Sequence, residues 1–303
     1  MPKKPNSHGM QEYVPKGNGD ASGEYADDGG NNYHFTNFSE PDDSFKNKFF
    51  KYFKGIMPMQ QREDEDREGI QKIVDWGKQN EVNIDSRAQY GTKQNIKSLQ
   101  QIKNLKNQFN VGKIDIIEDT ITDNKATTFY DPINNTLQLG LDITFFGSSD
   151  LFESTMLNYR DSKWAAQFED DKADEYIVTH EFGHILEYTW LIDNNFSEIA
   201  QRIYDEENGK SDFKRRFTDR INEQKYELFE KPFLKEVFKT AQKYDSTIKD
   251  FNGDIEQAPF VSRYAKHGWD EYIAEAFANG MLGRPTAIGK AVVETVKKWN
   301  RRK

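Results

Sequence analysis

The stretch 174-DEYIVTHEFGHILEYTW-190 decides which fold and which chemistry this chain is expected to have. It contains two of the five histidines of the sequence, four residues apart, in the pentapeptide HEFGH at 180–184. Four residues are slightly more than one turn of an α-helix, so His180 and His184 project from one face and can hold one Zn²⁺ ion. Glu181 is rotated by about 100° from His180, so its carboxylate can reach a water on the metal without binding the metal itself.

The HExxH spacing is typical of zinc hydrolases, in which the metal lowers the pKa of its water to about 7. The neighbouring glutamate takes a proton as this water attacks a carbonyl carbon. The alternative is a buried helix with two ordinary histidines, since the five-residue pattern also occurs by chance. A third ligand elsewhere in the chain is needed to separate these two interpretations.

The composition of the 303-residue chain narrows the classes of protein to which it can belong. Charged residues make up 31% of the sequence and the net charge is −9, which favours a soluble protein and disfavours a nucleic-acid binder. The absence of cysteine excludes disulfides, cysteine zinc ligands and thiol catalysis. Histidine and carboxylate side chains remain as the strong metal ligands.

The sequence contains no segment that resembles a membrane span or a secretory signal. Its apolar runs fall short of the ~18 residues that a membrane helix needs. Residues 1–10 lack the apolar core of a signal peptide. We therefore expect a cytoplasmic protein, or one that is associated with a virion or delivered by a route that the sequence does not show.

The beginning of the chain differs in composition from the rest. Residues 1–44 are rich in glycine and polar residues, so we expect a disordered leader. Residues 45–65 are expected to form a basic aromatic helix at 45–58, followed by a charged linker. This helix would dock on a membrane surface, an acidic partner or a nucleic acid, or else pack on the main domain or act as a tether. The acidic run at 63–66 cancels its positive field and favours the second interpretation. Residues 66–303 remain as the domain that carries the metal helix.

The residues before the metal helix predict a helical layer followed by a small, mostly antiparallel sheet. Residues 66–110 have apolar side chains at helical spacing in two runs, and 113–118 form a short strand. Residues 126–130 and 136–141 flank the turn sequence DPINN and are expected to form a β-hairpin, followed by a strand at 143–146. The strand at 136–141 is the candidate edge for pairing with an extended substrate; the alternative is an ordinary hairpin with no substrate role.

Two further segments are expected to shape the molecule. Residues 147–172 are predicted to be irregular, with Trp164 and Phe168 as anchors, either at the rim of the cleft or across the surface. Residues 191–250 are predicted to be helical and strongly charged. We interpret them as a packing insert between the metal helix and the next motif.

A second motif, 262-SRYAKHGWDEYIAEAFANG-280, offers the missing ligand. Glu271 and Glu275 are four residues apart on one face of a helix whose other residues are mostly small or apolar. Two carboxylates on such a surface are costly to bury unless they are paired or bind metal. One of them would complete a His₂Glu site with a fourth position left for water, and the other would accept a proton from a ligand imidazole. The alternative is a solvated acidic stripe.

HEFGH followed by Tyr-x₆-Glu-x₃-Glu-Ala-Phe resembles the catalytic domain of anthrax lethal factor and related zincins of phages and mobile elements. The resemblance covers residues 90–285 and implies an α+β, zincin-like metallopeptidase domain of the gluzincin type. It implies that His180, His184 and Glu271 hold Zn²⁺. His184 and Glu271 are further apart in sequence than in the toxin, so the helices between them differ.

The same resemblance implies roles for the residues around the metal. Glu275 would orient a ligand imidazole, Glu181 would act as the base, and Tyr264 would donate a hydrogen bond to the developing oxyanion. Alternatively, Tyr264 is an ordinary core tyrosine. His267 falls outside the motif and is interpreted as a surface or rim residue.

The function implied is a zinc-dependent endopeptidase that acts on a protein or peptide substrate. The alternative is a structural or interaction protein of a phage or mobile element, in which the zincin domain is a scaffold. Its function would then lie in the N-terminal segment and the partner on which that segment docks.

Overall fold

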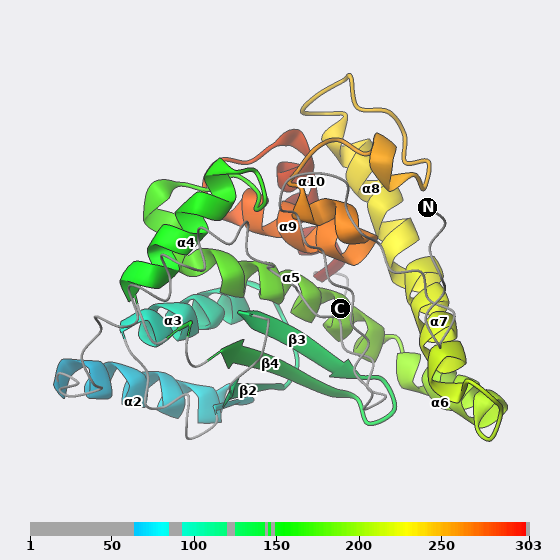
Figure 1. Cartoon of the computed structure of the whole chain (residues 1–303), viewed down its shortest axis with the longest axis horizontal. Helices are drawn as coiled ribbons and strands as arrows, with labels where there is room; N and C mark the ends of the chain where they lie inside the picture. The colour runs from blue at the N-terminus through cyan, green and yellow to red at the C-terminus, as the bar shows by residue number, and fades with distance from the viewer. Residues whose placement is uncertain (1–63, 85–92, 120–124, 143–144, 147–148, 301–303) are drawn as a thin grey trace, which may run out of the picture.

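The computed structural model describes most of the chain after its beginning, namely residues 64–84, 93–119, 125–142, 145–146 and 149–300 (Figure 1). The expected leader and the basic aromatic helix lie outside these residues. The described part is mixed α+β and mostly helical, which confirms the coarse fold class.

The chain first builds a layer of helices and strands. Its elements are α2 (Asp64–Gln79), β1 (Val82–Ile84), α3 (Lys93–Gln108), β2 (Ile114–Asp119), β3 (Ala126–Asp131), β4 (Thr136–Asp142) and α4 (Ser149–Asp161). The rest is helical: α5 (Ala173–Asp193), α6 (Phe196–Glu207), α7 (Phe213–Lys225), the π-helical turn η3 (Tyr226–Glu230), α8 (Lys231–Ala241), the 3₁₀ turn η5 (Tyr264–His267), α9 (Trp269–Met281) and α10 (Ala287–Asn300). Helices α2 and α3 are the two predicted in 66–110, and α6 to α8 confirm helical structure in 191–250.

The described strands form one mixed sheet in the order β1-β2-β4-β3. β1 pairs with β2 and β2 with β4 in parallel, and only β3 and β4 are antiparallel. The prediction of a mostly antiparallel sheet is therefore wrong. The alternation of apolar and polar residues predicts the hairpin, but it does not determine which of the two hairpin strands pairs with β2. Here β4 takes the inner place, with Leu137, Leu139 and Leu141 buried.

The hairpin itself is confirmed. Tyr130 pairs with Leu137, and Asp131 pairs with Thr136. The carboxylate of Asp131 accepts hydrogen bonds from the backbone N–H groups of the turn, as an Asx turn requires. The prediction that 136–141 is an edge strand is wrong, because β4 lies between β2 and β3. Among the described strands, β3 is the edge on this side of the sheet.

The prediction of irregular structure for 147–172 is wrong for 149–161 and correct for 162–169, and the predicted strand at 143–146 is wrong for its described residues. The part of 147–172 that is described begins with helix α4, because Phe152, Met156 and Tyr159 recur at helical spacing and are buried. Phe145 and Phe146 lie in a turn instead of a strand, and the N–H of Phe145 donates to Asp142 Oδ1 at 2.7 Å. The two predicted anchors are found: Phe168 is buried and Trp164 is half-buried.

Helix α5, which carries HEFGH, lies in the middle of the molecule (Figure 1). It packs against α3, α4 and β3 and, on another side, against α9. Ile177, Val178, Phe182 and Ile185 are fully buried. Because little of this helix faces solvent, the polar side chains of its motif also lie inside, where they are costly without partners.

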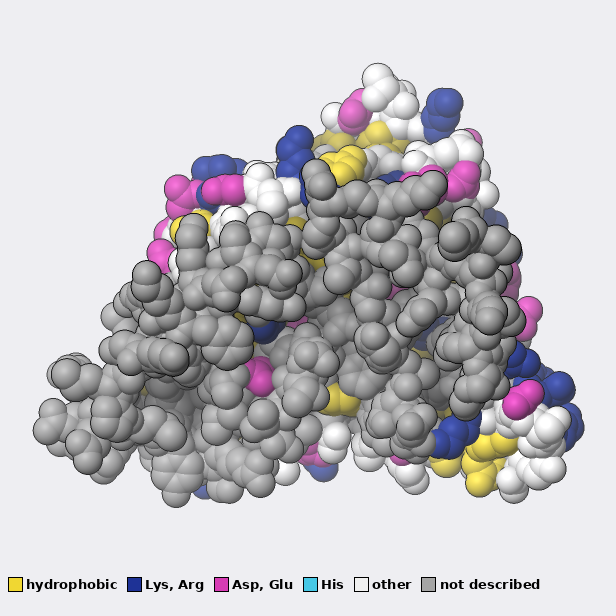
Figure 2. Space-filling model, in the orientation of Figure 1, with side chains coloured by type: hydrophobic (Ala, Val, Ile, Leu, Met, Phe, Trp, Pro, Cys, Tyr) yellow, Lys and Arg dark blue, Asp and Glu magenta, His cyan; other side chains and the backbone are white. Residues whose placement is uncertain are grey.

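The outer surface carries charges of both signs. Figure 2 shows Lys or Arg and Asp or Glu side chains intermixed along the upper and right-hand edges of the described part. Ion pairs such as Lys231–Glu227 and Arg284–Glu169 are exposed, so each contributes at most about 1 kcal/mol to stability. Among the helices that the structure describes, none has the length and apolarity needed to cross a lipid bilayer.

The contact between α5 and α9 depends on a glycine inside the HEFGH motif. A Cβ atom at Gly183 would lie 2.8 Å from the Cα and 3.1 Å from the Cβ of Ala274. The first contact is with helix backbone, which cannot rotate away as a side chain can. The two helices therefore approach this closely only because residue 183 has no side chain.

We predict that Gly183→Ala destabilises the protein. Alanine favours a helix over glycine by about 1 kcal/mol, but forcing α5 and α9 apart costs more, typically about 1–3 kcal/mol. The net loss is expected as a lower free energy of unfolding in urea titrations.

Gly69→Ala is the matched control, because Gly69 also lies within a helix but its added Cβ would meet only Ile96 side-chain atoms at 3.8 Å. At this position only the higher helix propensity of alanine acts, so we expect the free energy of unfolding to rise by about 0.5–1 kcal/mol. Equal effects of the two substitutions would contradict the assigned close approach.

Candidate metal centre

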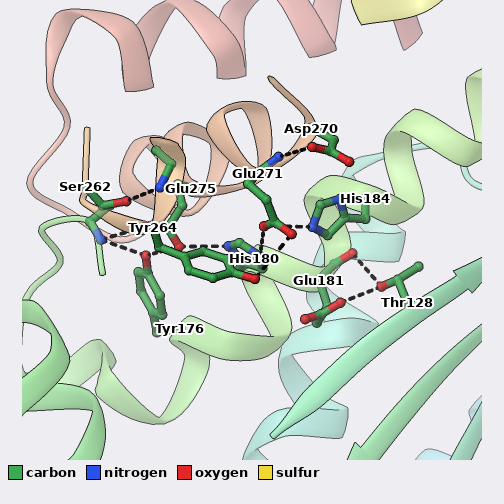
Figure 3. A network of polar contacts seen from close by, with 12 residues as sticks. Thr128, Tyr176, His180, Glu181, His184, Ser262, Tyr264, Asp270, Glu271 and Glu275 are labelled. Atoms are coloured by element: carbon green, nitrogen blue, oxygen red, sulfur yellow. Dashed lines mark hydrogen bonds and ion pairs between the residues drawn. The ribbon is translucent and has the colours of Figure 1, made fainter. Parts of the chain in front are cut away.

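Three side chains from two helices converge in the core. α5 supplies His180 and His184, and α9 supplies Glu271 (Figure 3). Glu271 Oε2 lies 3.2 Å from His180 Nε2 and 3.4 Å from His184 Nε2. The exposed fractions of the three side chains are 0%, 1% and 5%. Within the described residues, this is the group of histidine and carboxylate side chains whose ligand atoms lie close enough to share a metal ion.

The spacing of these atoms suits a tetrahedral metal ion. With metal–ligand bonds of about 2.0–2.1 Å, two ligand atoms of a tetrahedral site are separated by about 3.3 Å. The two distances from Glu271 Oε2 lie on either side of this value. Three protein ligands leave one tetrahedral position open, which is the arrangement of catalytic metal sites as opposed to structural ones.

The electrostatic field in this triad favours a positive charge. Burial alone would lower the pKa of His180, but its hydrogen bonds with Glu271 and Glu275 outweigh burial and raise the pKa to about 10. Burial alone would raise the pKa of Glu271, yet the charge of His184 and the hydrogen bond with His180 lower it to about 2. A field that stabilises a proton on imidazole acts in the same way on a metal cation, which competes with that proton for the ring nitrogen.

Glu275 contacts the imidazole of His180 on the side that faces away from Glu271. Its Oε1 lies 2.8 Å from His180 Nδ1, the nitrogen that faces away from Glu271 (Figure 3). Tyr176 donates to the same oxygen at 2.8 Å, and the backbone N–H of Ala166 lies 2.8 Å from Glu275 Oε2. An imidazole that donates Nδ1–H to a carboxylate presents the lone pair of Nε2 to a metal. Glu275 thus holds the imidazole of His180 from the side opposite Glu271.

Glu181 is held by the edge strand of the sheet. The hydroxyl of Thr128 on β3 lies 2.8 Å from Glu181 Oε2 and 3.1 Å from the carbonyl oxygen of the same residue. The hydroxyl has one hydrogen to donate, and the shorter contact to the charged acceptor is the stronger one. Glu181 is fully buried. Its carboxylate is thus fixed next to the triad instead of swinging freely.

Tyr264 and His267 come from the turn η5 that precedes α9. The hydroxyl of Tyr264 donates to Glu271 Oε1 at 3.3 Å, and the residue is 1% exposed. Burial, together with the charges of Glu271 and Glu181, raises the pKa of Tyr264 well above its ordinary value, so the hydroxyl keeps its proton as a donor. His267 is exposed and packs over the ring of Tyr264 with centroids 5.0 Å apart, which agrees with its interpretation as a rim residue.

Several polar groups near the triad are not indicated by any motif. Thr128 and Tyr176 belong to this set, and so does a buried lysine, Lys225 at the end of α7. For Lys225 the sequence does contain a signal. Apolar residues at 213, 217, 221 and 229 are spaced by multiples of four, so position 225 falls on the buried face of that helix. Thr128 offers no comparable signal, because its partner lies in another element.

Comparisons with known proteins add no further assignment. A scan against protein-family models, a search of curated proteins and a search of solved structures each find no match to this chain. The chemical interpretation of the site therefore depends on its own geometry.

We predict that the purified wild-type protein binds about one metal ion per chain after reconstitution with Zn²⁺. Glu271→Ala should bind zinc at least about tenfold more weakly, since loss of a ligand exceeds the loss of a ligand's support. Elemental analysis and chelator competition measure both quantities.

Glu223→Ala, which removes an exposed carboxylate on α7, is the control for unspecific binding to acidic groups. It should bind zinc as the wild type does. Wild-type protein without zinc would reject the metal centre and leave two buried histidines as part of an ordinary core.

Proposed function

We propose that this protein is a zinc-dependent endopeptidase. The observation that carries the proposal is the convergence of His180, His184 and Glu271, with the carboxylate of Glu181 held beside them. Two imidazoles and one carboxylate form a donor set that suits Zn²⁺, and an open fourth position is what a hydrolytic site requires.

A bound zinc ion would supply Lewis acidity, which polarises a carbonyl group and acidifies water at the site. The protein's own residues then determine how protons move. Glu181 accepts the proton of the attacking water and later delivers it to the leaving amine, as a general base and acid. The hydroxyl of Thr128 donates a hydrogen bond to one oxygen of that carboxylate, so the Glu181 side chain is already oriented before substrate binds.

Tyr264 contributes a hydrogen-bond donor to the proposed reaction. Its buried, protonated hydroxyl points at Glu271 in the substrate-free protein. When substrate is bound, it would turn to the oxygen on which negative charge develops, a contribution of about 3 kcal/mol in comparable sites. The indole of Trp164 and the ring of His267 pack against Tyr264 and limit the positions it can take.

A peptide substrate is favoured by the sheet beside the site. Among the described strands, β3 is the outermost on this side of the sheet and pairs with β4. The same strand carries Thr128, whose hydroxyl touches the proposed base. A peptide bound in extended form beside β3 would bring a peptide carbonyl near Glu181.

We predict that Glu181→Gln keeps about one zinc per chain but loses peptidase activity by at least about a hundredfold, because glutamine cannot accept the proton. The measurement is cleavage of a mixed peptide library, followed by mass spectrometry, together with metal analysis of the same samples. Cleavage by the variant at the wild-type rate would reject the mechanism. A zinc-loaded wild type that cleaves no peptide would reject the proposed function.

Thr128→Val should lower kcat by about 10–100-fold, the value of a hydrogen bond to a charged group expressed as a rate. Valine matches threonine in shape and suits a strand, so the fold is expected to be kept. KM and zinc content should not change.

Thr128→Ser is the control, because serine retains the hydroxyl. It should recover most of the lost rate. If serine and valine are equally slow, packing of the methyl group matters, and the hydrogen bond to Glu181 does not.

A further inference from the structure

The buried Lys225 lies among three carboxylates from three different elements. Its Nζ atom lies 3.4 Å from Glu187 on α5, 3.5 Å from Glu230 at the end of η3, and 3.3 Å from Asp270 on α9. None of these four side chains is more than 8% exposed. Charged groups this deep are strongly destabilising without partners, so the cluster binds the three elements to one another.

Two contacts of Lys225, one with a carboxylate and one with an aromatic ring, lead to the proposed metal ligands. Asp270 faces Lys225 through Oδ2, while its Oδ1 accepts the backbone N–H of Glu271 at 2.9 Å (Figure 3). Lys225 Nζ also lies 5.5 Å from the centre of the Tyr188 ring. That ring is nearly parallel to the imidazole of His184, at 23° and 6.5 Å between centroids.

The backbone around Lys225 is unusual at this point. Helices α7 and α8 continue into each other through the π-helical turn η3, which begins directly after Lys225 and ends at Glu230. π-Helical turns inside α-helices are rare and occur mainly at functional sites. The wider turn lets residues 225 and 230 both face the same buried carboxylates.

The cluster is electrically asymmetric. Burial lowers the pKa of Lys225, but Glu187, Tyr188 and Asp270 together raise it well above its ordinary value, so the ammonium stays charged. Burial raises the pKa of Glu230 well above its ordinary value despite the nearby Lys225. Two of the three carboxylates that face the ammonium lie on α5 and α9, the helices that carry the proposed ligands.

We propose that Lys225 is a positioning residue of the metal centre, whose ammonium draws the first turn of α9 towards α5 and so fixes Glu271 opposite His184. This inference rests on the proposed metal site. It gives the insert between the two motifs a task beyond packing, since the site would be incomplete without a side chain from that insert.

The test is the zinc affinity of variants, measured by chelator competition well below the unfolding temperature. Asp270→Asn keeps the oxygen that accepts the Glu271 N–H but removes the charge that faces Lys225. Lys225→Met removes the ammonium and keeps most of the length. Both should bind zinc about 10–100-fold more weakly than the wild type, as is usual when a ligand loses its support. The visible spectrum of the Co²⁺-loaded proteins should also change, because it reports ligand geometry.

Glu230→Gln is the matched control at the same ammonium. Glu230 faces the ammonium from η3, outside the two helices that carry the proposed ligands, so this variant should bind zinc like the wild type. If Lys225→Met does not fold, Asp270→Asn decides the matter.

Unchanged zinc affinity in Asp270→Asn would overturn this inference and leave the proposed function intact. Equal weakening in Glu230→Gln would overturn it as well, because packing would then be the cause. A wild type that binds no zinc would overturn both this inference and the proposed function.

Discussion

The carboxylate of Glu271, buried between two imidazoles, is the constraint on which the rest of the structure depends. A carboxylate this far from water is tolerated only with positive charge or donors around it, and His180, His184 and Tyr264 supply these. To bring them together, α9 must lie against α5 at a distance that only a glycine at 183 allows. The two motifs are therefore one structural unit, although they are far apart in the sequence.

Each layer of the molecule supplies one part of the environment of this carboxylate. The sheet supplies Thr128 at the edge strand β3, which holds Glu181. The segment between α4 and α5 supplies the backbone N–H of Ala166, which faces Glu275. The long helix formed by α7, η3 and α8 supplies Lys225. Few of these contacts are local in sequence, so the site forms only when the whole described domain has folded.

The sequence predicts the parts of this site that follow from periodicity and spacing. HEFGH and the pair Glu271 and Glu275 lie on helices with their polar groups on the expected faces, and the predicted hairpin forms between residues 126–131 and 136–142. The order of strands could not be obtained in this way, because either strand of a hairpin can meet β2. The role of Thr128 could not be predicted either. Its hydroxyl contacts Glu181, 53 residues further along the chain, and no local pattern encodes such a contact.

The π-helical turn at Tyr226–Glu230 has a consequence for how the length of this segment can vary. Such a turn amounts to one extra residue within an α-helix, and each α-helical residue corresponds to a rotation of about 100°. Deleting a single residue within η3 would let the helix become regular while α8 keeps the same face towards α10, whereas deleting a residue of α7 or α8 outside it would rotate everything beyond by about 100°. Changes in length on either side of η3 are thus not equivalent to changes in a loop. The contacts of Lys225 with Glu187 and Asp270 fix the rotation of this long helix about its own axis.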